Sequence, residues 1–230
     1  MFHPLLPSRL VGLLVGLLLS ATVAHSQDVT ATSPAFTLGV RAGYSTYTLE
    51  GKEVELLTQP QGNSLQRSQW FTLGGVLRQR VYKPLAVQAE VSYVREGGDF
   101  KRAGFPGKTV YTIDCLHIPL LLDVQVPLTP TNLSLHLQGG AALVLVMRGV
   151  ELDTPSFAPQ NSFDNQTSFF AAAGGAEMAW QQGRRSYFLN LRYTQDLTDY
   201  YRREYYGTHY YARSNGFQLT AGLLMGLPVK

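Results

Sequence analysis

Ionisable side chains recur at alternate positions in several stretches of this 230-residue sequence. Alternate side chains of a β-strand point to the same face of a sheet, so these charges would gather on one side. Buried there, they would need partners of opposite charge to offset the loss of hydration. The candidate network comprises Arg41, Arg78, Arg80, Glu90, His117, Asp123, Glu177 and Arg192. A ladder of arginine–carboxylate pairs that fills an interior is favoured over a narrow polar path or a ligand site.

Metal binding is a second chemistry to consider. Cys115 and His117 lie two residues apart and would share one face of a strand. The single cysteine excludes an internal disulfide and a site built from several thiolates. No further soft ligand lies nearby in the sequence, so a packed pair is the favoured interpretation. We therefore predict neither a metal nor a cofactor.

Catalysis would need a nucleophile, a base and a group that orients the base. Candidate residues fall near the ends of the expected strands: Ser45, Ser92, Ser168, Asp196, Asp199 and His209. No local motif ties these residues into one site, and the sequence has no glycine-rich phosphate loop. We predict that the protein is not an enzyme, and an enzyme built at the rim of a barrel is the least favoured alternative.

Eight stretches of alternating polarity would position these residues. They are residues 36–49, 68–82, 85–96, 109–126, 132–150, 167–181, 186–196 and 215–227. The last is the clearest, because six apolar residues alternate with Gln218, Thr220, Gly222, Leu224 and Gly226. Pro119 cannot donate to a sheet ladder, so a bulge or a local break is expected there. The connections alternate between long and short.

The N-terminus has the pattern of a secretory signal peptide. Arg9 precedes an apolar run of residues 10–24, and small residues follow at Ala24 and Ser26. The run is short for a transmembrane anchor, which is the alternative. We predict a signal peptide at 1–26 and a single β-barrel domain at 27–230.

These features predict an all-β fold, an eight-stranded antiparallel up-and-down transmembrane β-barrel. Charged residues make up 15% of the chain, where soluble domains average about 25%. Aromatic residues fall at both ends of the strands, as membrane girdles do. Those on the turn side are Phe36, Tyr82, Trp180 and Tyr187, and those on the loop side are Tyr44, Phe71, Tyr93, Phe170, Tyr193 and Phe217. A soluble barrel would need the opposite polarity, with its apolar face inward.

The closing strand resembles the C-terminal signal by which bacterial outer-membrane barrels are recognised for assembly. The matching positions are Thr220, Gly222, Met225 and Leu227. That signal usually ends the chain in an aromatic residue, whereas here three further residues follow Leu227. The match implies the barrel-assembly machinery as a partner.

Four short stretches resemble the PorT-like, porin-type family of outer-membrane β-barrels. They are GVRAG at 39–43, EVSY at 90–93, LHIPL at 116–120 and GFQL at 216–219. The resemblance implies the outer membrane of a Gram-negative-type bacterium, with outer-membrane lipid as a partner. It also implies a porin-like channel or a transport or secretion accessory as the alternative to a structural, surface-interacting barrel. A net charge of +3 is too small to indicate nucleic acid.

A tyrosine-rich segment precedes the closing strand. The recognition candidates in it are Tyr200, Tyr201, Arg202, Arg203, Tyr205, Tyr206, Tyr210 and Tyr211. Tyrosine and arginine are enriched at binding hot spots, so one interpretation is a surface that recognises a glycan, a lipopolysaccharide headgroup or a partner protein. The alternative, which we weight more heavily, is the tall outer end of a hairpin whose tyrosines stack across strands.

Overall fold

The computed structural model describes residues 36–52, 54–55, 64–101, 108–128, 131–152, 168–199, 201–205 and 208–227. Within these ranges, the side chains at 100, 108–111, 148–152 and 201–210 are not described. The predicted signal peptide at 1–26 lies outside the described residues, so it stays a prediction. In the part of the chain that is described, no helix is long and apolar enough to cross a membrane.

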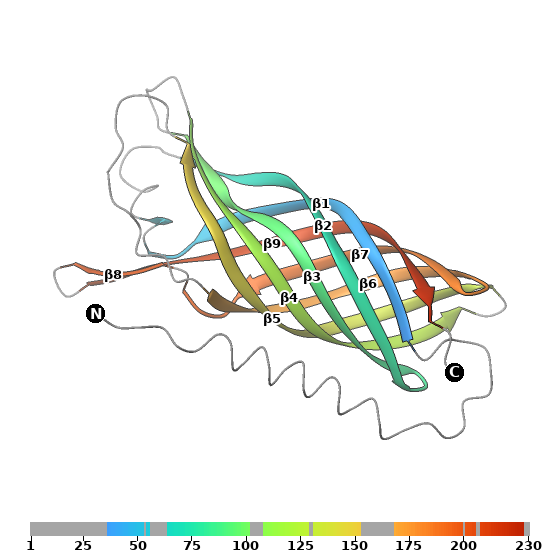
Figure 1. Cartoon of the computed structure of the whole chain (residues 1–230). Coiled ribbons are helices and arrows are strands. Elements are labelled where there is room, and N and C mark those ends of the chain that lie inside the picture. Colours follow the sequence, from blue (N-terminus) through green and yellow to red (C-terminus); the bar gives the residue numbers. More distant parts are fainter. Residues whose placement is uncertain are drawn as a thin grey trace. The chain divides into compact units, whose positions relative to one another are not determined.

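The described residues form nine β-strands (Figure 1). These are β1 (Phe36–Glu50), β2 (Ser64–Tyr82), β3 (Leu85–Lys101), β4 (Lys108–Leu128), β5 (Leu133–Leu152), β6 (Ser168–Gln182), β7 (Arg185–Asp196), β8 (Tyr201–Tyr205) and β9 (Thr208–Gly226). Neighbouring strands pair in the order β1-β2-β3-β4-β5-β6-β7-β9, and β1 also pairs with β9. All of these pairings are antiparallel, so eight strands close into an up-and-down barrel and the predicted fold class is confirmed.

Closure between the first and last strands is extensive. The β1–β9 ladder runs from Thr37 opposite Gly226 to Glu50 opposite Arg213. Strand β8 pairs with the part of β9 that continues beyond this ladder. The β8–β9 hairpin therefore extends the sheet past the outer end of the barrel, as its projection at the left of Figure 1 shows.

The faces of the barrel follow the predicted alternation. Leu73 on β2 is 63% exposed, whereas Val76 and Arg78 on the same strand are buried. Aromatic side chains contact one another across strands on the outer face, with Tyr193 and Phe217 at a centroid distance of 5.0 Å. The other girdle pairs are Tyr44 with Phe71 and Trp180 with Tyr187. An apolar outer face around a polar interior is the arrangement of a barrel that faces lipid.

Three short turns lie at one end of the barrel, as predicted. They connect β2 to β3 at Lys83–Pro84, β4 to β5 at 129–132, and β6 to β7 at Gly183–Arg184. Gly183 has a φ of 61°, a left-handed conformation that glycine adopts without strain. The longer connections lie at the opposite end, which is therefore the outer end.

Three predicted strand ends at the outer side were wrong, because β2, β3 and β9 continue into segments predicted as loops. Strand β2 begins at Ser64, β3 ends at Lys101, and β9 begins at Thr208. Backbone pairing beyond the apolar band needs no alternation of polarity, so the sequence pattern fades before the strands end.

Pro119 interrupts one ladder without shifting its register. Strands β3 and β4 pair at Ala89 with Leu120 and again at Ser92 with His117, in one continuous alignment. The ladder to β5 continues through Pro119 opposite Ala142. The local break that was predicted is therefore present, whereas the bulge between β4 and β5 lies at Asp114 and Cys115.

Candidate functional site

The interior of the barrel holds one continuous network of polar side chains, contributed by all eight strands of the closed sheet. We call it the central network. Its members are Arg41 (β1), Arg78 (β2), Gln88 and Glu90 (β3), Asp123 (β4), His136 and Gln138 (β5), Glu177 (β6), Asn190 and Arg192 (β7), and Gln218 (β9). Every one of these residues is buried.

Glu90 is the acceptor at the middle of the central network. Arg192 donates to it in a two-pronged arrangement, Nη1 to Oε2 at 2.6 Å and Nη2 to Oε1 at 2.7 Å. Arg41 Nη1 lies 2.5 Å from Oε2, and Gln88 Nε2 donates to Oε1. Charge-assisted, two-pronged contacts are the strongest and most directional that a carboxylate makes. Glu90 therefore fixes the positions of two guanidinium groups from opposite parts of the chain.

Arg78 is a cation that contacts two carboxylates, as Glu90 is a carboxylate that contacts two cations. Its Nη2 lies 2.6 Å from Glu177 Oε1, and its Nε lies 3.1 Å from Asp123 Oδ2. Gln138 connects the contacts of Arg78 with those of Glu90. Its amide nitrogen donates to Asp123 and Glu177, and its oxygen accepts from Arg192. The glutamine thus converts separate ion pairs into a single network.

The central network is balanced in charge. Among the described side chains, three guanidinium groups contact three carboxylates within it. An eight-stranded barrel has an interior that side chains are just able to fill. A cavity of about 10 Å³, lined in part by His117, Arg192 and Gln218, has room for roughly one water molecule. The lumen is therefore a packed core of polar groups.

Two predicted members lie outside the central network. Arg80 donates to Gln125 at 2.9 Å near the turn end, where it is partly exposed. His117 pairs instead with Glu96, at 2.8 Å. Sequence reasoning also missed the amide members Gln88, Gln138, Asn190 and Gln218, although each falls on the predicted inward phase. Their position on the inward phase was the available signal, although these amide side chains carry no charge.

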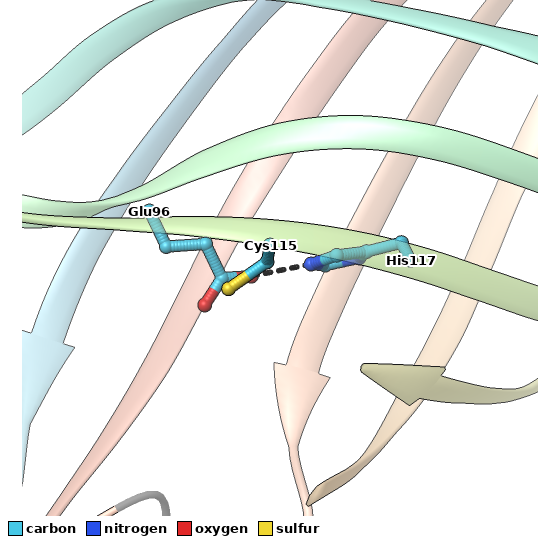
Figure 2. A group of neighbouring side chains, drawn as sticks. All are labelled: Glu96, Cys115 and His117. Atoms are coloured by element: carbon cyan, nitrogen blue, oxygen red, sulfur yellow. Dashed lines mark ion pairs between the residues drawn. The ribbon is translucent and has the colours of Figure 1, made fainter. Parts of the chain in front are cut away.

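A separate group of side chains lies in the outer half of the lumen, and we call Glu96, Cys115 and His117 the outer cluster (Figure 2). Cys115 and His117 come from β4, and Glu96 comes from the neighbouring β3. All three are buried, and one potential ligand atom of each lies within 4.8 Å of the others. Sequence reasoning missed Glu96 as an inward residue because it ended the strand there, yet Glu96 continues the phase of Glu90 and Ser92.

The catalytic candidates are not assembled into a site by the described contacts. The Ser45 hydroxyl donates to the backbone oxygen of Trp70, and Asp196 accepts from the backbone nitrogen of Ser214. Asp199 accepts from Arg213 at 2.7 Å, a contact that raises the pKa of Arg213. Ser168 is exposed, Ser92 lines the small cavity, and the side chain of His209 is outside the described set.

The assembly-signal residues divide between the two faces of β9. Thr220 is buried in the lumen, whereas Met225 and Leu227 are exposed on the apolar outer face. A Cβ at Gly222 would collide with the Phe188 ring and the Val40 backbone oxygen. Of the recognition candidates, Tyr211 is partly buried under the Arg213 guanidinium, 5.3 Å from its ring centroid. The side chains of Tyr200, Tyr201, Arg202, Arg203, Tyr205, Tyr206 and Tyr210 lie outside the described set.

Two solved structures have a similar fold. The outer membrane protein OprG from Pseudomonas aeruginosa matches with a TM-score of 0.52 at 12% identity, over 85% of this chain and 98% of its own. Neisserial surface protein A (NspA) matches with a TM-score of 0.50 at 13% identity, over 86% of this chain and 100% of its own. At these identities the likeness concerns the fold alone. A comparison with curated protein sequences finds no significant match.

A sequence model of a protein family matches residues 12–202, which is most of the chain. The model describes the outer membrane protein beta-barrel domain. Its match agrees with the closed sheet, the apolar outer face and the aromatic girdles. The chain therefore belongs to the outer membrane protein beta-barrel domain family and is a small eight-stranded barrel of the Gram-negative outer membrane.

Proposed function

We propose that this protein is a surface-interacting barrel whose lumen does not conduct. The central network carries the proposal, because it joins all eight strands across the interior with charge-balanced contacts. A conducting pore needs a continuous aqueous path, and side chains fill the interior of a barrel of this size. The function then resides at the outer end, on the strands and loops that continue beyond the membrane.

The β8–β9 hairpin is the element best suited to that role. Its backbone pairs Arg202 with Tyr211 and Arg203 with Tyr210, beyond the last pairing of β9 with β1. Tyrosine gives a large contact area at a low entropic cost, and arginine binds phosphates with directed hydrogen bonds. The residue types fit a glycan, a lipopolysaccharide headgroup or the surface of a partner protein. No catalytic step is part of the proposal.

Planar-bilayer recordings test the closed lumen. The purified barrel should give no conductance steps above the baseline, while a large trimeric porin reconstituted in the same lipid serves as the positive control. Reproducible steps from the heat-modifiable, folded protein would overturn the proposal. The variant Arg192→Ala should show whether loss of one guanidinium opens a path.

Shortening the hairpin tests the site of recognition. Residues 200–211 are replaced by a Gly-Asn turn, and folding is checked by heat modifiability. Binding is then measured to lipopolysaccharide vesicles, to glycan arrays and to outer-membrane extracts. A matched control shortens the 153–167 connection instead. If the protein with the shortened hairpin retains every interaction of the parent, the assignment to the hairpin is wrong, whatever the control does.

A second candidate is a transport or secretion accessory of the PorT-like type. It is supported by the PorT-like stretches at 39–43, 90–93, 116–120 and 216–219. In that role the barrel would associate with other envelope proteins. Chemical crosslinking in intact cells distinguishes the two candidates, because an accessory should be captured with the same envelope partner whether or not the β8–β9 hairpin is present.

A further inference from the structure

The outer half of the lumen differs from the central network in its charge. Glu96 and Asp196 are both buried there, at 1% and 2% exposure. Among the described residues, no arginine or lysine lies within ion-pair distance of either carboxylate, and the ion pair of Glu96 is with His117. A buried carboxylate without an arginine or lysine partner favours a cation.

The polar atoms of the outer cluster are also short of hydrogen bonds. His117 Nε2 lies 2.8 Å from Glu96 Oε1, but the contact does not have hydrogen-bond geometry. Both carboxylate oxygens of Glu96 and Nε2 of His117 therefore lack a hydrogen-bond partner within the described structure, although all are buried. Buried polar atoms of this kind are rare in native proteins, and an unplaced ion is one explanation. Figure 2 shows these groups directed toward one another, with the sulfur of Cys115 beside them.

From this geometry we propose that the outer cluster binds a zinc-type divalent cation. One carboxylate oxygen, one thiolate sulfur and one imidazole nitrogen form a ligand set suited to Zn²⁺ and its close relatives. Mg²⁺ and Ca²⁺ prefer all-oxygen sites, so this set disfavours them. Ligand atoms around tetrahedral zinc stand roughly 3.3–3.8 Å apart, for bonds of about 2.0–2.3 Å. Separations within 4.8 Å need only side-chain adjustment to reach that arrangement.

Binding would proceed with the loss of protons that the ligands carry. Cys115 coordinates as a thiolate and releases its proton to solvent, and His117 coordinates as the neutral imidazole. The two positive charges of the ion balance the Cys115 thiolate and the Glu96 carboxylate. The fourth position is left for a water molecule, and His117 also lines the small cavity of the lumen.

The single cysteine makes the site directly measurable. Co²⁺ substitutes for Zn²⁺, and a thiolate ligand gives it a sulfur-to-metal charge-transfer band. Because Cys115 is the chain's only cysteine, that band can arise only from this site. The tag-free barrel is folded in detergent with Co²⁺ present during folding, because the ligands are buried and exchange afterwards would be slow. We expect one Co²⁺ per chain, and no band when Zn²⁺ in excess is also present during folding.

Four variants separate a built site from other causes. Cys115→Ser should abolish the band, and Glu96→Gln and His117→Gln should each weaken binding by at least about 10- to 100-fold. His136→Gln is the matched control, since it removes another buried lumen histidine, one that pairs with Asp123. It should retain full binding.

Folding of every variant is checked by heat modifiability. Absence of the band from the folded parent overturns the proposal, whatever the variants do. A band that survives both Glu96→Gln and His117→Gln would also overturn it, because the cysteine would then be binding without the other two ligands.

Discussion

Replacing Glu90 by alanine should destabilise the barrel severely. The side chain is fully buried and accepts from Arg41, Arg192 and Gln88. Its removal leaves two guanidinium groups buried beside each other without the carboxylate that they share. Breaking a buried ion pair by removing one partner costs about 3–5 kcal/mol, and the upper part of that range applies here because two cations lose their partner.

The expected shift can be measured by urea unfolding of the protein in lipid vesicles. With a slope of about 2 kcal/mol per molar urea, the midpoint should fall by roughly 2–2.5 M. Glu50→Ala is the matched control, since Glu50 is only partly buried at the outer end and should contribute less than about 1 kcal/mol. A double variant with Arg192→Met should recover part of the loss, because it removes one of the two stranded cations. A Glu90→Ala midpoint equal to that of the parent would refute the argument that the network is dry and paired.

Two further predictions concern the walls of the barrel. Met225→Asp places a charge on the lipid face, and the free energy cost should be below the roughly 2–4 kcal/mol of an arginine at the bilayer midplane. Gly222→Asp forces a side chain into the packed Phe188 ring. Both should lower the amount of heat-modifiable protein in outer membranes, and normal amounts in both would count against the role of this strand in assembly. Gly140→Ala should cost about 1–3 kcal/mol, because its methyl group would meet a backbone oxygen of β4, whereas Gly139→Ala meets nothing within 4 Å and should be neutral. Equal urea midpoints for the two alanine variants would show that the inward position is not crowded.

The sequence was sufficient to predict the faces of the strands. Lipid on one side and a filled lumen on the other impose the same alternation on every strand, so Leu73 and Arg78 could be assigned from β2 alone. The outer ends of β2, β3 and β9 could not be predicted. Ser64 and Thr208 begin strands in segments that carry no apolar alternation, because backbone pairing alone maintains the sheet there.

The pairing of the inward charges was also beyond the sequence. Arg41 and Glu90 lie on strands that are not neighbours, and they meet across the lumen. Such contacts depend on the stagger of all the strands around the barrel, which no single strand encodes. His117 was assigned to the same set as Glu90, yet the stagger places it beside Glu96 instead.

The central network also acts as a check on strand alignment. If β9 slid along β1 by two residues, every lipid-facing side chain would still face lipid, because the side-chain period of a strand is two. The bilayer would then scarcely distinguish the correct alignment from the shifted one. The interior would distinguish them, since the shift would carry Gln218 away from Arg41 and leave buried donors without acceptors. Hydrophobicity thus determines which face of each strand points to the lipid, and the buried polar groups determine the register of each strand with its neighbour.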